Sequence, residues 1–294
     1  MKRKATHFLA AAALLALGAA SLLACPLAFV VNFSGQFGLI DLATGAFTPI
    51  GKGLDNTPDG IAGKPGGPYY TVDGVTGHLI RIGIDGKTTD VGDTHTGPNA
   101  GPVGISLIGS LTDGTIYALD FSNRLFRINP DTAALTGVAW LITLPQQELD
   151  YSGNMTTSLT GDGNLLYYTV EIMEGARKTG PTLYIIDPVK LSVTARPLKN
   201  LPSRIIGSGI VNGVFYLFGE GGHILTLNPA TGDTKLVSRY ESNNADGPPL
   251  TGIFGVTSAA EPNALGPPPK HSEELERPIV RSNWPPRWVP SAKR

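Results

Sequence analysis

The sequence contains a single cysteine, Cys25, and only five histidines in 294 residues. One cysteine cannot form an internal disulfide, and it supplies too few ligands for a cysteine-based metal site. The histidines beyond the N-terminal segment include no pair at the H-x-x-x-H spacing of a metal site: His78, His95, His223 and His271. We therefore expect neither a metal nor a cofactor.

Motifs of catalysis and nucleotide binding are also missing. There is no Gly-x-Ser-x-Gly elbow, no phosphate-binding loop and no dinucleotide fingerprint. Charged residues make up 16% of the chain, against about 25% in typical domains. The central part of the chain is mildly acidic, whereas binding to a phosphate backbone needs clustered Lys and Arg. We expect no nucleic-acid partner.

Glycine and proline, in contrast, are abundant, with 37 and 24 residues. No stretch between the turn signals has a helical period that would suit a parallel βαβ protein. A chain rich in turns and poor in charge is typical of an all-β protein built from many short strands.

The first 24 residues have the three parts of a secretory signal peptide. Lys2, Arg3 and Lys4 form a positive start, an apolar run follows from Phe8 to Ala24, and small residues precede the expected cut. Residues 1–24 are therefore predicted to be removed on export. The apolar run is slightly short for a membrane span.

The residues Leu22-Leu23-Ala24-Cys25 resemble the lipobox of bacterial lipoproteins. The resemblance implies that Cys25 is thioether-linked to diacylglycerol and becomes the acylated first residue. Two or three acyl chains hold a protein stably at a membrane, whereas one binds marginally. The sequence thus predicts an exported protein, periplasmic or at the cell surface, attached to a membrane through Cys25. The alternative is an ordinary cleaved signal with a cysteine near the cut.

One sequence pattern recurs five times. "LTLNPATGDTKLV" (225–237) has counterparts at "LIDLATGAFTPI", "LIRIGIDGKTTDV", "LFRINPDTAALTGV" and "LYIIDPVKLSVTA". In each copy an alternating apolar strand ends and is often followed by Asn or Asp. Pro fixes φ in three copies, and Gly supplies a positive φ at Gly45, Gly86 and Gly232. This pattern predicts a β-hairpin with its turn at a fixed offset.

Upstream of four hairpins lies a further pair of strands, separated by a Gly-containing turn. Four strands in about 45 residues, repeated, are typical of β-propeller blades. The first copy has room for three strands only, and "TGIFGVTSA" (251–259) resembles the missing inner strand. We therefore predict an all-β, five-bladed β-propeller over residues 25–259, closed by the C-terminal strand. The longer interval between Ile128 and Ile186 leaves six blades as the alternative.

The segment from Pro58 to Gly92 is similar to the repeats of NHL-type and streptogramin-lyase-type propellers, and the "I-D-x-A-T-G" copy resembles secreted bacterial propellers. The resemblance implies a propeller fold for residues 28–259. Streptogramin lyases use a His and acidic metal ligands from loops on one face. No corresponding His-x-Glu or paired carboxylate loop is present here, so the resemblance does not extend to that activity.

Residues 260–294 contain eight prolines and no blade pattern. We predict a disordered, Pro-rich tail. Trp284 and Trp288 lie in it beside arginines, a combination found at partner and membrane contacts.

Polar residues at the starts of the inner strands are the candidate ligand site, because these strands converge on the central channel. They are Asp59, Asn99, Asn154, Arg204 and Thr251. Asp59 and Arg204 are the only anion and cation among them, which would suit a small polar or zwitterionic ligand; capping of the strand ends is the alternative role. We predict a monomeric binding or scaffold module for a protein, peptide or glycan. The alternative is a secreted hydrolase or lyase acting at the channel mouth.

Overall fold

The structure, a computed structural model, describes six segments: residues 26–94, 104–120, 124–141, 155–172, 180–240 and 253–258. These residues form strands, turns and irregular segments, with the strands numbered β1 to β20. None of the described segments forms a helix long and apolar enough to span a membrane. The predicted signal peptide, Cys25 and the predicted tail lie outside the described residues.

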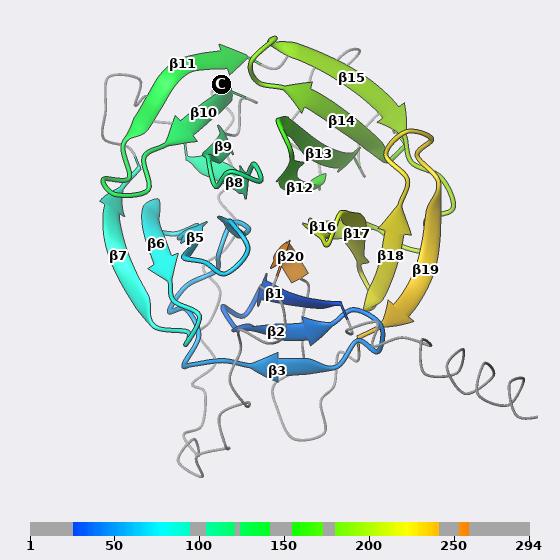
Figure 1. Ribbon diagram of the computed structural model, residues 1–294, viewed down its shortest axis with the longest axis horizontal. Helices are drawn as coiled ribbons and strands as arrows, with labels where there is room; N and C mark the ends of the chain where they lie inside the picture. Colours follow the sequence, from blue (N-terminus) through cyan, green and yellow to red (C-terminus); the bar gives the residue numbers. More distant parts are fainter. Residues whose placement is uncertain are drawn as a thin grey trace, which may run out of the picture.

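The strands form five antiparallel blades of four strands, arranged as a ring (Figure 1). Blade 1 comprises β20 (Ile253–Ser258), β1 (Leu27–Asn32), β2 (Phe37–Asp41) and β3 (Phe47–Pro49). Blade 2 comprises β4 (Ala62–Gly63), β5 (Tyr69–Val72), β6 (His78–Ile82) and β7 (Thr88–Asp93). Blade 3 comprises β8 (Ile105–Ser110), β9 (Ile116–Asp120), β10 (Arg124–Ile128) and β11 (Leu135–Leu141). Blade 4 comprises β12 (Met155–Asp162), β13 (Leu165–Ile172), β14 (Thr182–Asp187) and β15 (Ser192–Pro197). Blade 5 comprises β16 (Ile205–Val211), β17 (Val214–Gly219), β18 (His223–Leu227) and β19 (Thr234–Arg239).

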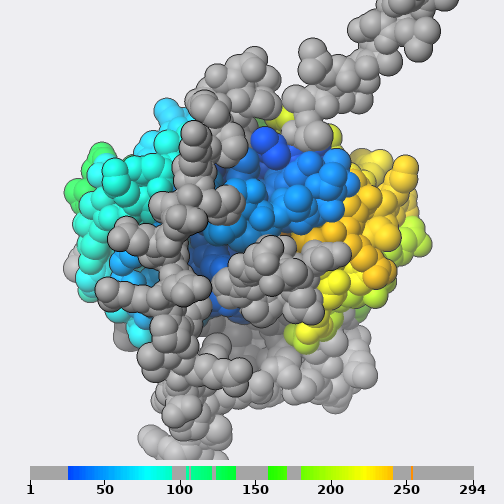
Figure 2. Space-filling model, turned by 90° about the horizontal axis from the view of Figure 1, so that it is seen from below, coloured from blue at the N-terminus to red at the C-terminus, as the bar shows by residue number. Residues whose placement is uncertain are grey.

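The ring closes as the sequence predicts. Strand β20, near the C-terminus, is the inner strand of blade 1 and pairs with β1 in antiparallel register, with Ala28 opposite Ser258. It also meets β16 in parallel at Ser208 and Gly255, which joins blades 5 and 1 into one eight-stranded sheet. Figure 2 shows blade 1 between blade 2 and blade 5 at the side of the ring. The five-bladed prediction is confirmed, and the six-bladed alternative is wrong.

The inner strands all run in the same direction along the central axis of the ring. Besides the parallel bridge between Ser208 and Gly255, Gly60 forms a parallel bridge with Ile108 at the junction of blades 2 and 3. All inner strands therefore begin on one face of the ring, which we call the entry face, and end on the other, the exit face. The start of β1 lies on the exit face, because Ala28 pairs with the last residue of β20.

The core lies between blades, because each blade is covered on both sides by its neighbours. Strand β1 is buried along almost its whole length, whereas the outer strand β15 is mostly exposed. Between blades 1 and 2, Phe29 stacks on Phe37 at 5.3 Å and meets Tyr69 at 4.9 Å between ring centroids. This burial on both faces explains why the inner half of each blade has continuous apolar runs instead of strict alternation.

The recurring hairpin turn is capped by its first side chain. In four blades the Oδ1 of this Asn or Asp accepts a hydrogen bond from the backbone N–H two residues later, at 2.8 to 3.0 Å. The capping residues are Asp41, Asn129, Asp187 and Asn228. Such local bonds are the reason that Asn and Asp favour turns. The sequence motif thus corresponds to a self-capping turn at the end of the third strand.

The fifth residue of each such turn has a positive φ, and in blades 1 and 5 it faces the preceding blade. A Cβ on Gly232 would lie 2.0 Å from the carbonyl oxygen of Pro197, and one on Gly45 would lie 2.1 Å from that of Arg239. Both glycines have φ near +80°. The turn therefore touches the backbone at the end of the preceding blade's outer strand, which explains why the motif is repeated: it joins one blade to the next. We call this contact the interblade latch.

Candidate functional site

Two of the five candidate ligand-site residues, which we expect around the rim of the central channel, lie in the described segments. Asp59 directly precedes Gly60, which bridges to blade 3, and Arg204 directly precedes β16. Both lie at the beginning of an inner strand, and so on the entry face. Asn99, Asn154 and Thr251 lie outside the described residues, and their place at the rim stays a prediction.

The backbone of Asp59 holds it between two blades. Its N–H donates to the carbonyl of Val72 at 2.9 Å, and its own carbonyl accepts from the N–H of Ile108 at 3.1 Å. Its carboxyl lies against Gly74, where a Cβ would be only 3.0 Å from Oδ2. Within the described segments, no residue donates a hydrogen bond to this carboxyl. The fold thus positions Asp59 firmly without using its side chain.

Burial and, to a smaller extent, the negative charge of Asp73 together raise the pKa of Asp59 to about 7. Asp73 behaves in the opposite way: partial burial pushes its pKa upward, but hydrogen bonds outweigh this and lower it. The donors are Asn56 Nδ2 at 2.6 Å and the N–H groups of Val75 and Thr76 at 2.8 and 3.0 Å. Two nearby carboxyls with separated pKa values can divide the roles of acid and ionised partner.

Arg204 lies on the same face in blade 5. Its guanidinium is 3.8 Å from the carboxylate of Glu220, a loose ion pair, and the Glu220 N–H donates to the Arg204 carbonyl at 2.7 Å. The Nε of Arg204 is buried, and no described residue accepts its hydrogen bond. Within the described part of the chain, Arg204 and Asp59 form no ion pair with each other. The structure brings each to the entry face with separate partners.

A hydroxyl–imidazole pair lies beside Arg204. Ser203 Oγ is 2.9 Å from His223 Nδ1, which is also 3.1 Å from the carbonyl oxygen of Glu220. This pair has no signature in the sequence, because its members are separated by 20 positions and only the register of β16, β17 and β18 brings them together. The Gly-Glu-Gly-Gly turn before His223 was the only local signal.

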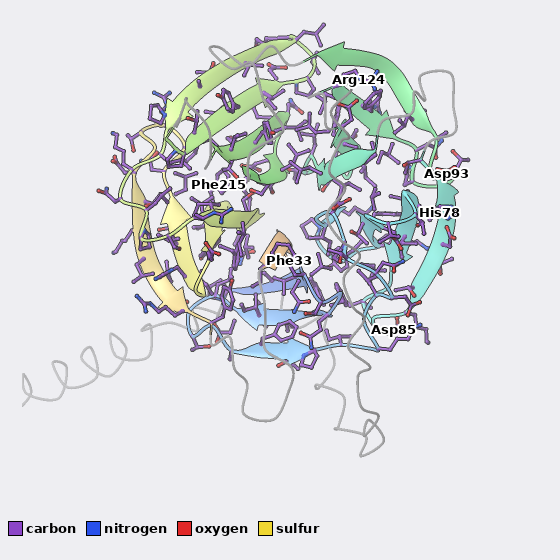
Figure 3. The ribbon with its side chains drawn as sticks, turned by 180° about the vertical axis from the view of Figure 1, so that it is seen from behind. Phe33, His78, Asp85, Asp93, Arg124 and Phe215 are labelled. Carbon is purple, nitrogen blue, oxygen red and sulfur yellow. The ribbon has the colours of Figure 1, made fainter. Side chains whose placement is uncertain are left out.

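His78 occupies the position in blade 2 that His223 occupies in blade 5, the first residue of the third strand. Its Nδ1 is 2.8 Å from Asp90 Oδ2 on the neighbouring strand. Figure 3 places His78 toward the periphery of the ring and Phe33 near its centre, beside β20. The two histidines therefore share a place in the repeat but have different partners. In the described segments, no group of three or more His, Cys, Asp or Glu side chains could hold a metal ion.

A cavity of about 340 Å³ lies between blades 4 and 5, on the exit face of the ring. Tyr167 and Phe215 form one wall in an edge-to-face contact at 5.2 Å, and Asp162, Val214 and Asn228 line it from exit-face turns. Most of its lining is apolar in kind, and Asp162 contributes a single carboxylate. It is separate from the residues that gather on the entry face.

No protein-family model matches the chain, and no curated protein sequence matches it. Among solved structures, an inactive variant of virginiamycin B lyase from Staphylococcus aureus with quinupristin has a TM-score of 0.40 and 16% identity, covering 71% of this chain and 68% of that chain. A glutaminyl cyclase from Myxococcus xanthus has a TM-score of 0.37 and 17% identity, covering 68% and 69%. Both neighbours are β-propellers; their activities are properties of those proteins.

Proposed function

We propose that this propeller is an exported, lipid-anchored binding module that recognises a protein, peptide or glycan on its entry face. In this proposal Cys25 carries the acyl chains and holds the monomeric ring at a membrane, either in the periplasm or at the cell surface. The rigid five-bladed ring supplies a fixed surface, and the side chains at the starts of the inner strands supply the contacts.

The observation that carries the proposal is the unused hydrogen-bonding capacity of Asp59 and Arg204. Within the described segments, the buried Nε of Arg204 has no hydrogen-bond acceptor, and the carboxyl of the half-buried Asp59 receives no hydrogen bond from a described residue. Buried polar groups are normally satisfied, because an unmade bond costs about 1–3 kcal/mol. A polar ligand that donates to Asp59 and accepts from Arg204 would recover this energy with charge-assisted bonds.

Binding of the full chain to an array of peptides and glycans tests this. The double substitution Asp59→Asn and Arg204→Gln should weaken binding at least about tenfold, since each lost charge-assisted bond costs on the order of 1.5–3 kcal/mol. The matched control is Asp85→Asn with Lys87→Gln, an exposed pair 2.9 Å apart in an exit-face turn, which should leave binding intact. A double entry-face variant that binds the same targets as strongly as the wild type would refute the proposal.

The anchor has its own test. Wild-type protein should incorporate a labelled fatty acid and remain with membranes, whereas Cys25→Ser should take up no label and appear in the soluble fraction. Equal labelling of both proteins would show that Cys25 is not the acylated residue.

The second candidate is a secreted hydrolase or lyase acting at the channel mouth, and the paired carboxyls favour it. A group with a pKa of about 7, as for Asp59, is well matched to general acid–base catalysis near neutral pH. Asn99, Asn154 and Arg204 would orient the substrate. A stoichiometric divalent ion in the purified full chain, lost on Asp59→Asn but retained in Asp85→Asn, would favour this candidate over the binding module.

A further inference from the structure

The anchor and the ring are joined with almost no linker. Pro26 is already fixed in blade 1, because its carbonyl accepts a hydrogen bond from the N–H of Leu42 at 2.9 Å. The next residue, Leu27, pairs with Asp41 at the end of β2. Cys25 is one peptide unit before Pro26, and consecutive Cα atoms are about 3.8 Å apart. An acyl group on Cys25 would therefore place the membrane surface beside the exit face of blade 1.

Exposed apolar side chains occur at turns on both faces, but those of two third-strand turns on the exit side are accompanied by lysines. Val189 is 80% exposed and Leu191 57% exposed in the turn of blade 4, and Ile84 is 42% exposed in the corresponding turn of blade 2. These turns end the third strand, and Ile186 at the end of β14 pairs with Leu166 at the start of β13. The register thus puts the tip of the blade 4 turn at the same end of the blade as the turn between β12 and β13, at the outer edge of the exit face (Figure 1).

A lysine accompanies the apolar residue in both turns. Lys190 lies between Val189 and Leu191 in the sequence, and Lys87 follows Ile84 by three residues. Each lysine pairs at 2.9 Å with an aspartate of its own turn. Apolar tips flanked by long cationic side chains suit the boundary between lipid headgroups and acyl chains, where the stem can be buried while the ammonium stays at the phosphates.

We propose that the exit face is the membrane-facing side of the anchored protein, with the blade 4 turn (Val189 to Leu191) in contact with lipid headgroups. The inference rests on the acylation of Cys25 proposed above. It assigns the two faces different partners: the exit face contacts the lipid surface, and the entry face, with Asp59 and Arg204, is directed away from it. A ligand therefore approaches from the aqueous side.

Two exposed valines make a matched test. Val189 is 80% exposed on the exit face, and Val75 is 75% exposed in the turn after Asp73 on the entry face. Val189→Cys and Val75→Cys would each be introduced into the full chain, whose own cysteine is blocked when acylated, and labelled with a bimane fluorophore. The proteins are then reconstituted into phosphatidylcholine–phosphatidylglycerol vesicles that carry a nitroxide near the lipid headgroup.

Nitroxide lipid should quench bimane at position 189 at least threefold more strongly than bimane at position 75. Equal quenching at both positions, or stronger quenching at position 75, in a chain that incorporates fatty acid would overturn the orientation and leave the anchor standing. A wild-type chain that incorporates no fatty acid would overturn the anchor and this inference together. The two failures are thus distinguishable by the acylation measurement.

Discussion

The carboxylates of the exit-face turns and the carboxyl of Asp59 on the entry face have contrasting surroundings. Hydrogen bonds from the backbone N–H of Thr115 and of Lys190 lower the pKa of Asp113 and of Asp187, respectively, so the fold itself uses these charges. Asp59 has a pKa raised to about 7 by burial and by Asp73, and no described residue donates to it. The difference shows that the turn carboxylates stabilise their turns, whereas the Asp59 carboxyl on the entry face makes no hydrogen bond that stabilises the described fold.

The largest expected effect comes from a substitution in the interblade latch, where the turns serve a structural role. Gly232→Ala would place a Cβ 2.0 Å from the Pro197 carbonyl in a residue with φ of +77°. The backbone of blade 4 or 5 must shift, so we expect unfolding in urea to show a loss of about 3–4 kcal/mol.

The matched control is Gly213→Ala. This glycine has φ of +74°, but nothing lies within 4 Å of its Cβ position. Here only the left-handed backbone is penalised, by about 1–2 kcal/mol. If both substitutions cost the same, the latch contact contributes nothing, and the repeated turn is required for its own conformation alone.

The next effect tests the entry face through pH. The pKa of Asp59 in the folded protein, about 7, is above the unfolded value of 3.8. The folded state therefore binds the proton more tightly; its contribution to stability is complete below pH 4 and is lost as pH rises through 7. The full shift corresponds to about 4 kcal/mol, and partial exposure of the carboxyl reduces this. Asp59→Asn should therefore remove this dependence and raise stability at pH 8, relative to wild type, by about 2 kcal/mol more than at pH 4.

Asp85→Asn provides the control, because the side-chain hydrogen bond from Lys87 lowers the pKa of Asp85, so this carboxyl titrates below the range in which Asp59 loses its proton. Urea unfolding of the three proteins at pH 4, 6 and 8 gives the comparison. A wild-type profile that is flat between pH 4 and 8 would mean that Asp59 has an ordinary pKa, and the contrast between the two faces would disappear.

A smaller effect is expected when the side-chain cap of one exit-face turn is removed. Asn228→Ala would remove the hydrogen bond from the Ala230 N–H to Oδ1, 3.0 Å long. The turn is solvent-exposed, so water replaces part of the bond, and we expect a loss of about 1 kcal/mol. Lys235→Ala, exposed on the neighbouring β19, serves as the control with no measurable change. An Asn228→Ala protein as stable as the wild type would show that the side-chain cap is dispensable in this turn.

The repeated motif predicted the strands, the ring closure and the glycines of the turns, because each depends on residues close in sequence. It could not predict that Ala133 and Leu191 adopt the same left-handed backbone as Gly45 and Gly232, since neither residue favours it. The proximity of Asp59 to Asp73 and of Ser203 to His223 was also inaccessible. These contacts depend on how strands of one blade register with each other, and no local propensity records that.

The smallest expected effect concerns Leu191, which occupies in the blade 4 turn the position that Gly45 and Gly232 occupy in blades 1 and 5. Its φ of +53° is unfavourable for a residue with a Cβ, and its side chain is 57% exposed, so truncation removes little packing. Leu191→Gly should relieve the backbone strain but increase the entropy of the unfolded chain, giving a net gain of up to about 0.5 kcal/mol. Unfolding should be measured in detergent, without a bilayer, so that lipid contacts of this turn do not contribute. Leu191→Ala retains the strained Cβ and should show no gain. If Gly and Ala at this position are equally stable, the turn of blade 4 is not strained by its backbone, and its positive φ follows from the repeat at no cost.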